Sequence, residues 1–240
     1  MEVPSIVEML KAGMHFGHKT SRWYPKMKPY IFTEKEDIHV IDLEKTQEML
    51  NDMLEQVKDR AADGDTFLFM STKPQASDVV EEAAREVDMP YLTERWVGGL
   101  FTNFPEVKKS IDKFLDLKQK QASGELEKYT KKEQMEFAKY IEKKEEYLGG
   151  LTSLEGVPEV LFVPSVQNEK IATKEAKKEG VDVIGVCDTN ADPKEADVFV
   201  PGNDDAVKSI EMIVNLVRDA IKEGLEEYEK EQAIKEDQQS

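Results

Sequence analysis

Short runs of apolar residues alternate with amphipathic segments along most of this chain, and this pattern restricts its fold more than any other feature. The apolar runs lie at 66–70, 90–92, 160–163, 183–186 and 198–200. Such continuous runs are typical of strands that are buried on both faces. Between and around them, apolar residues recur at helical spacing over 43–62, 74–87, 168–178 and 204–221. We therefore predict an α/β fold, with a parallel sheet that carries helices on both faces.

One segment, 105–148, interrupts this alternation. It is dense in Lys and Glu, lacks strand patterning, and carries two apolar stripes at helical spacing on either side of Ser123-Gly124. We predict two helices folded into an inserted antiparallel coiled-coil hairpin; the alternative is a solvated, extended linker. The expected organisation is a discontinuous α/β domain at 1–104 and 149–224, the hairpin insert at 105–148, and a fraying acidic tail at 225–240.

Cysteine content and hydropathy point to a cytoplasmic protein. Cys187 is the single cysteine, so no internal disulfide can form, and a reduced intracellular compartment is expected. The N-terminal residues show no basic start followed by an apolar run, which argues against a signal peptide. No apolar stretch approaches the roughly 20 residues that a membrane span needs.

The distribution of charge matters more than its sum. The net charge of −17 argues by itself against nucleic acid, because phosphate binding relies on Lys and Arg. However, residues 13–33 contain no Asp or Glu, and there basic residues are interleaved with aromatic ones. We expect an irregular N-terminal extension that contacts RNA backbone and unpaired bases; the alternative is that it packs its aromatic residues and solvates its lysines. The residues assigned to RNA in this segment are Lys19, Arg22, Trp23, Lys26 and Lys28.

Two strand ends supply further candidates for RNA contact. Lys73 lies between a strand and a helix start, a position suited to phosphate, although a solvated lysine is an equal alternative. Arg95 and Trp96 can bind phosphate and stack on a base, or Trp96 can pack against the base of the hairpin. The following Gly98-Gly99 pair matches no nucleotide-binding glycine pattern, which disfavours a nucleotide-dependent enzyme.

Acidic residues follow two of the predicted strands, at Asp188 and Asp192 and at Asp204 and Asp205. Because carboxyl ends of parallel strands share one edge of a sheet, these side chains can converge. With His15 or His18 from the N-terminal segment they can bind a divalent cation, zinc or manganese for mixed ligands and magnesium for oxygen alone. The alternative, which the residues alone favour, is that Asp192 caps one helix and that Asn203, Asp204 and Asp205 cap and charge the start of the last helix.

Together these motifs resemble the S-two family of bacterial small-subunit ribosomal proteins. The matching pieces, which appear in the family's order over about residues 5–222, are 12–18, 23–27, 29–32, 38–46, 72–76, 95–99, 188–190 and 201–206. The resemblance implies a flavodoxin-like parallel sheet with a protruding hairpin, at the junction of head and body of the small subunit. It implies contact with small-subunit ribosomal RNA and with other small-subunit proteins, and recruitment of the largest of them (S-one).

The resemblance also bears on catalysis and metal. The family has no known catalytic activity, so a structural role in translation is expected, and a nucleotide- or metal-dependent α/β enzyme is the alternative. Positions that hold zinc in some members match His18, Asp188, Asp204 and Asp205. With this resemblance, a site for zinc or another divalent cation and helix capping are equal alternatives for these residues. The stretch 164–168 departs from the family because it lacks the acidic residue expected there.

Overall fold

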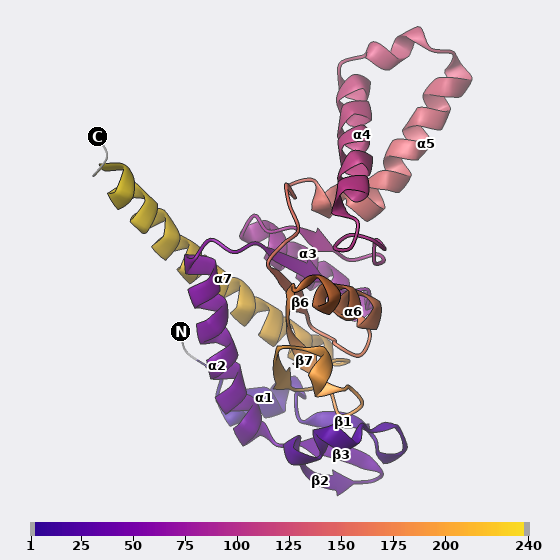
Figure 1. Ribbon diagram of the computed structural model, residues 1–240. Coiled ribbons are helices and arrows are strands. Elements are labelled where there is room, and N and C mark those ends of the chain that lie inside the picture. Colours follow the sequence, from indigo (N-terminus) through magenta and orange to yellow (C-terminus); the bar gives the residue numbers. More distant parts are fainter. Residues whose placement is uncertain (1–2, 238–240) are drawn as a thin grey trace.

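A five-stranded parallel sheet forms the centre of the protein, in a computed structural model that describes residues 3–237 (Figure 1). Its strands are β4 (Phe67–Met70), β5 (Tyr91–Leu92), β6 (Val160–Val163), β7 (Asp182–Cys187) and β8 (Val198–Pro201). They are arranged in the order β5-β4-β6-β7-β8, and all four neighbouring pairs are parallel. This is the flavodoxin-like order, in which the second strand precedes the first. The predicted fold class is confirmed.

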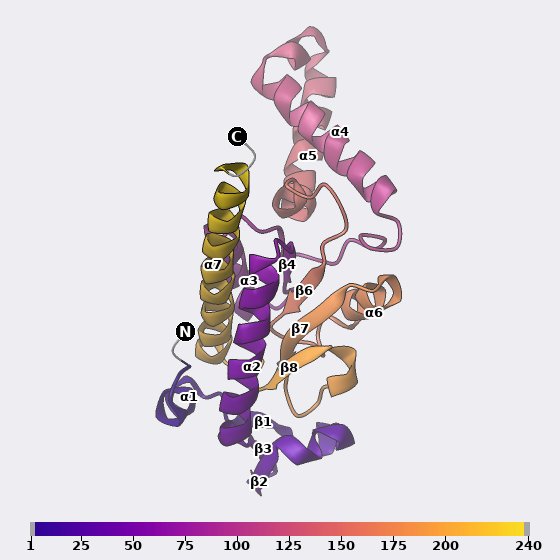
Figure 2. The ribbon, with the colours of Figure 1, turned by 60° about the vertical axis from the view of Figure 1, so that its left-hand side comes forward.

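Each face of the sheet buries its own apolar core. Phe67, Phe69 and Phe162 face a core with α2 (Leu43–Ala62), α3 (Pro74–Glu86) and α7 (Val207–Asp237). Leu68 and Leu161 face a second core with α6 (Lys170–Glu179). Figure 2 shows these helix layers on opposite sides of the strands. Alternate residues of the same strand are buried in both directions, which explains why the strands are apolar at consecutive positions.

The last helix does not end where the sequence suggested. The expectation of a helix end near Ile221 and a fraying tail from 225 is wrong, because α7 runs to Asp237; residues 238–240 lie outside the described part. Gly224 lets α7 approach α2 closely, since a Cβ there would lie 2.3 Å from the Lys58 carbonyl oxygen. Lys58 Nζ in turn lies 2.7 Å from Glu227 Oε1. Packing against α2 thus extends the helix into its acidic part.

The segment between β5 and β6 holds two helices, α4 (Phe104–Ala122) and α5 (Lys131–Leu148), joined through η3 (Glu125–Lys128). They project away from the sheet (Figure 1). Phe114 and Ile141 are buried, and Lys118 Nζ lies 2.7 Å from Glu145 Oε2 across the two helices. A coiled coil along their whole length stays a prediction.

The N-terminal extension is more regular than expected. After α1 (Ile6–Ala12), the strands β1 (Phe16–Lys19), β2 (Ile31–Lys35) and β3 (Ile38–Ile41) form an antiparallel sheet in the order β1-β3-β2. The 3-10 helices η1 (Thr20–Arg22) and η2 (Pro25–Tyr30) lie between β1 and β2. The prediction of irregular structure is wrong here. No residue of β1 or β2 is fully buried, and neither strand shows the burial alternation that a sequence pattern could reveal.

No helix in the described range 3–237 is both long and apolar enough to span a bilayer.

Candidate functional site

Loops at the carboxyl ends of β7 and β8 hold the N-terminal extension in place. Asn203 donates from Nδ2 to the Gly13 carbonyl oxygen at 3.0 Å and from its backbone N–H to the Met14 oxygen at 3.1 Å. The buried Thr189 accepts from the His18 N–H at its Oγ1, 2.8 Å away, and from the Tyr24 N–H at its carbonyl oxygen, 2.7 Å away. Two of the motifs found in the sequence therefore fasten the extension to the sheet.

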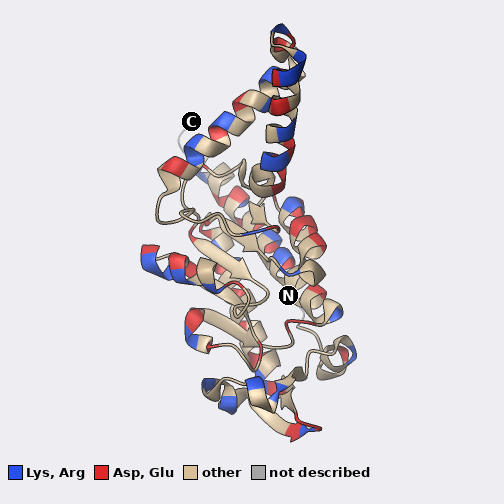
Figure 3. Ribbon diagram, turned by 90° about the vertical axis from the view of Figure 1, so that its right-hand side faces the viewer, with Lys and Arg blue, Asp and Glu red and all other residues tan. Residues whose placement is uncertain are grey.

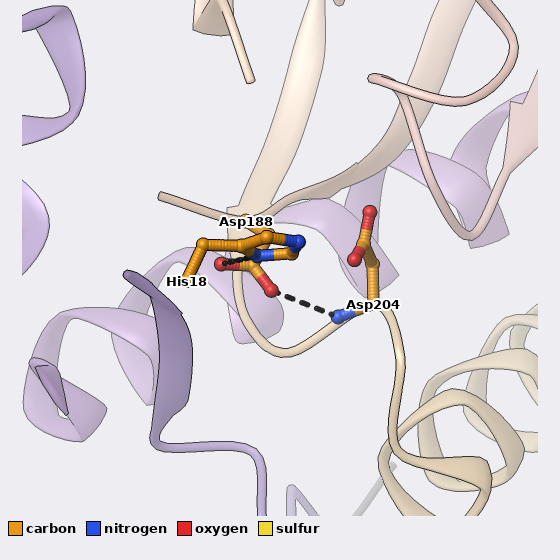
Figure 4. A group of neighbouring side chains, drawn as sticks. All are labelled: His18, Asp188 and Asp204. Carbon is orange, nitrogen blue, oxygen red and sulfur yellow. Dashed lines mark hydrogen bonds and ion pairs between the residues drawn. The ribbon is translucent and has the colours of Figure 1, made fainter. Parts of the chain in front are cut away.

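This docking places His18 over a group of carboxylates (Figure 4). His18 Nδ1 lies 3.1 Å from Asp188 Oδ1, and His18 Nε2 lies 3.4 Å from Asp205 Oδ2. Lys73 Nζ lies 2.9 Å from Asp204 Oδ1 and 2.9 Å from Asp205 Oδ1. We call these five residues the strand-end cluster.

The strand-end cluster balances buried negative charge with its own cations. Asp188 and Asp204 are each 1 % exposed. Burial, followed by repulsion from Asp188, raises the pKa of Asp204, and the Lys73 ammonium opposes this shift. The hydrogen bond to Asp188 raises the pKa of His18, although burial opposes it. Burial would lower the pKa of Lys73, but attraction to Asp204 and Asp205 raises it overall. Each of the two buried carboxylates thus has a basic side chain beside it, His18 for Asp188 and Lys73 for Asp204.

Two of the residues that the capping alternative named, Asp192 and Asn203, do cap helices. Asn203 Oδ1 accepts from the N–H groups of Asp205 at 2.8 Å and Ala206 at 3.1 Å, just before α7 begins. Asp192 caps η5 (Pro193–Glu195) by accepting from the Lys194 N–H at 3.0 Å. The side chain of Asp204 contacts Lys73, and that of Asp205 contacts His18 and Lys73.

The donor set of this cluster fits a divalent cation. Ligand atoms of His18, Asp188 and Asp204 all lie within 4.8 Å of one another. Bonds of about 2.0–2.1 Å around tetrahedral zinc place its ligands about 3.3–3.4 Å apart, so modest side-chain movement would close the set. Asp204 Oδ1 is buried, and its partner is the Lys73 ammonium 2.9 Å away. His15, the alternative histidine, packs on Phe16 with ring centroids 3.9 Å apart, outside this group.

The residues assigned to RNA in the extension fall into two groups. Lys19, Arg22 and Lys28 are exposed and form no ion pair within residues 3–237. Lys26 is instead 3.0 Å from Asp192 Oδ2, and Trp23 packs on the buried His39 with ring centroids 5.3 Å apart. Figure 3 shows basic residues among the elements at the lower end of the molecule, where the extension lies.

The other three candidates for RNA contact make internal contacts. Trp96 Nε1 donates to Glu175 Oε2 at 2.7 Å, and its ring packs on Phe101 with centroids 5.0 Å apart. The exposed Arg95 lies over the Tyr147 ring, 4.4 Å from its centroid. Lys73, only 14 % exposed, is held by its two carboxylates. These contacts of Trp96 are thus with α6 and with its own loop, and its part in RNA binding stays a prediction.

Sequence reasoning missed Glu175, which organises the loop that follows β5. Its carboxylate accepts from Trp96 and from the backbone N–H groups of Gly99, Phe101 and Thr102. Burial opposes ionisation, but the hydrogen bonds from Thr102 and Trp96 lower the pKa of Glu175. In the sequence Glu175 is one of many charged residues on a helix, and no local signal distinguishes it.

Hydrogen bonds within the chain connect the loops at the crevice where this fold usually binds ligands. It lies between β4 and β6, where the strand order reverses. There Glu169, 3 % exposed, accepts from the Thr72 N–H at 2.7 Å and the Thr72 hydroxyl at 2.9 Å. Ser165 donates to Asp204 Oδ2 at 2.6 Å.

Comparison with known proteins identifies the family. Residues 9–224 match the family described as Ribosomal protein S2. This chain belongs to the ribosomal protein S2 family. It is 47 % identical over 217 residues to "Small ribosomal subunit protein uS2" of Geotalea uraniireducens (strain Rf4), covering 90 % of this chain and 85 % of that protein. It is 43 % identical over 233 residues to the protein of the same name from Bdellovibrio bacteriovorus (strain HD100), covering 97 % and 74 %.

Membership in this family decides the question of catalysis. Ribosomal protein S2 is a structural family and not an enzyme family. The expectation of a non-enzyme is confirmed, and the alternative of a nucleotide- or metal-dependent enzyme is set aside.

Proposed function

We propose that this protein is a structural constituent of the small ribosomal subunit in translation, and that it works in the cytoplasm as part of the ribosome. It binds ribosomal RNA at the junction of head and body through its N-terminal extension. The observation that carries this proposal is that the acid-free stretch 13–33 is fastened to the sheet while Lys19, Arg22 and Lys28 stay exposed.

A fixed basic surface can bind a polyanion even on an acidic protein. RNA responds to the local potential, because exposed charges farther apart than about 8 Å are largely screened at physiological salt. The extension is anchored by backbone and buried hydrogen bonds, so little ordering entropy opposes its binding. The helical pair α4–α5 offers a second, weaker surface, since residues 104–148 hold eleven Lys and ten Asp or Glu.

The test is co-sedimentation with small subunits over a range of salt. The variant Lys19→Gln/Arg22→Gln/Lys28→Gln removes three exposed charges that have no internal partner within residues 3–237. The matched control Lys174→Gln/Lys178→Gln/Lys222→Gln removes the same charge from exposed positions on α6 and α7. We expect the first variant to lose affinity and to lower the salt slope by about 2–3, while the control keeps both.

Binding at the wild-type level by both variants would refute the role of the extension. Equal loss in both variants would mean that only net charge matters.

We further propose that the protein helps recruit the largest small-subunit protein, through the projecting α4–α5 pair. Met135 is 60 % exposed and Tyr129 is 40 % exposed there, so apolar side chains are available for a protein partner. Particles carrying Met135→Lys should retain this chain but lose the largest protein, as measured by mass spectrometry. Unchanged content of that protein would contradict this assignment.

The strand-end cluster is proposed to hold zinc or another divalent cation through His18, Asp188, Asp204 and Asp205. Such an ion would supply a structural cross-link between the extension, which carries His18, and the loops after β7 and β8. Metal analysis of the purified protein should give about one zinc per chain, and none for His18→Ala. Equal zinc in both proteins would refute the site.

A further inference from the structure

Lys73 occupies an unusual position for a lysine. Its side chain is 14 % exposed, and its ammonium is 2.9 Å from carboxylate oxygens of both Asp204 and Asp205. It also donates to the Asp204 carbonyl oxygen at 2.8 Å. Lys73 immediately precedes α3, and its backbone is fixed because Pro74 begins that helix.

The Lys73 ammonium and a bound divalent ion would both be attracted to the Asp204 carboxylate. Asp204 Oδ1 lies 2.9 Å from Lys73 Nζ, and Asp204 also belongs to the group that can hold a metal. An ion bound to that oxygen at about 2.0–2.2 Å would lie no more than about 5 Å from Lys73 Nζ. At that distance two like charges repel strongly in a partly buried site.

We propose that Lys73 is an internal cation that competes with metal for the strand-end cluster and thereby sets its metal affinity. Its ammonium balances Asp204 and Asp205, and it must move away from Asp204 when a divalent ion binds. The inference builds on the metal site proposed above, but it assigns a separate role to Lys73.

The first experiment compares zinc affinity in full-length variants by calorimetry with chelator competition. Lys73→Met keeps an unbranched side chain, one atom shorter, and removes its charge, whereas Lys73→Arg keeps the charge. Lys26→Met is the matched control, because it removes one ammonium that is bound to Asp192 and not to the strand-end cluster. We expect Lys73→Met to bind zinc at least ten-fold more tightly than wild type, and Lys73→Arg and Lys26→Met to resemble wild type.

A second experiment uses the wild-type chain and so does not depend on folding of a variant. Acylation of lysines by an activated ester is followed by mass spectrometry with and without zinc. We expect zinc to increase the labelling of Lys73 and to leave that of Lys26 unchanged.

The outcomes separate the two proposals. Tight zinc binding by Lys73→Met with none by wild type would support the role of Lys73 and refute the metal site of the natural chain. Equal affinity of wild type and Lys73→Met, or zinc binding by neither, would overturn the role of Lys73. If Lys73→Met fails to fold, unchanged labelling of Lys73 in the presence of zinc overturns it.

Discussion

Replacing Gly17 by Ala tests whether docking of the extension, and not only its charge, matters for function. A Cβ at this position would lie 2.6 Å from Thr189 Cγ2, 2.8 Å from Thr189 Oγ1 and 3.0 Å from the His39 carbonyl oxygen. The backbone of Gly17 is not in the left-handed region, so the effect is steric. The contacts are with a buried side chain and with backbone, neither of which can move freely.

The expected loss of stability in Gly17→Ala has two contributions. Overpacking a well-packed site costs about 1–3 kcal/mol. If Thr189 moves, the hydrogen bond from the His18 N–H to its Oγ1 is lost as well, at about 0.5–1.5 kcal/mol. We therefore expect a loss of about 2–4 kcal/mol, less than the total stability of a typical domain, so the chain stays folded with a displaced extension.

The assay combines urea denaturation with co-sedimentation on small subunits. Gly98→Ala is the control, because no atom lies within 4 Å of a Cβ at that position. Thr189→Ala should partly rescue Gly17→Ala, since it removes both atoms of the closest contacts. The reasoning is refuted if Gly17→Ala unfolds and sediments like wild type, or if the double variant shows purely additive losses.

Three further substitutions test the packing and hydrogen bonding of the scaffold. Glu175→Gln should lower the free energy of unfolding by about 1–3 kcal/mol at pH 7. The amide nitrogen that replaces one carboxylate oxygen would face N–H donors and could not accept a hydrogen bond from them. Since the folded-state pKa of Glu175 is below its usual 4.5, this contribution is present above that pH and is lost as pH falls through the folded value, so urea titrations of both proteins should converge in acid. Gly224→Ala should cost about 1–3 kcal/mol or more by separating α7 from α2, whereas Gly156→Ala, where a Cβ meets open space, should be neutral in thermal unfolding. Ser165→Ala removes the donor to Asp204 Oδ2 and should lower the free energy of unfolding by about 1–3 kcal/mol in urea denaturation; an unchanged midpoint would contradict that role.

The sequence alone determined the parallel sheet and its helices. Strands buried on both faces must be apolar at every position, and amphipathic helices must repeat their apolar residues every three to four positions, so both signals are local. The acid-free extension was also determined by the sequence alone, because the order of charged residues along the chain is a local feature. The motifs were also sufficient to indicate the family.

Tertiary structure decided which of the marked residues meet. His18 and Asp188 lie 170 positions apart, and only docking of the extension on Thr189 brings them together. Tertiary structure also places Lys73 beside Asp204 and Asp205. It brings Glu175, which no local pattern distinguishes, to the loop after β5, where it accepts hydrogen bonds. Hydrogen bonds and ion pairs depend on distance in space, which local sequence patterns do not encode.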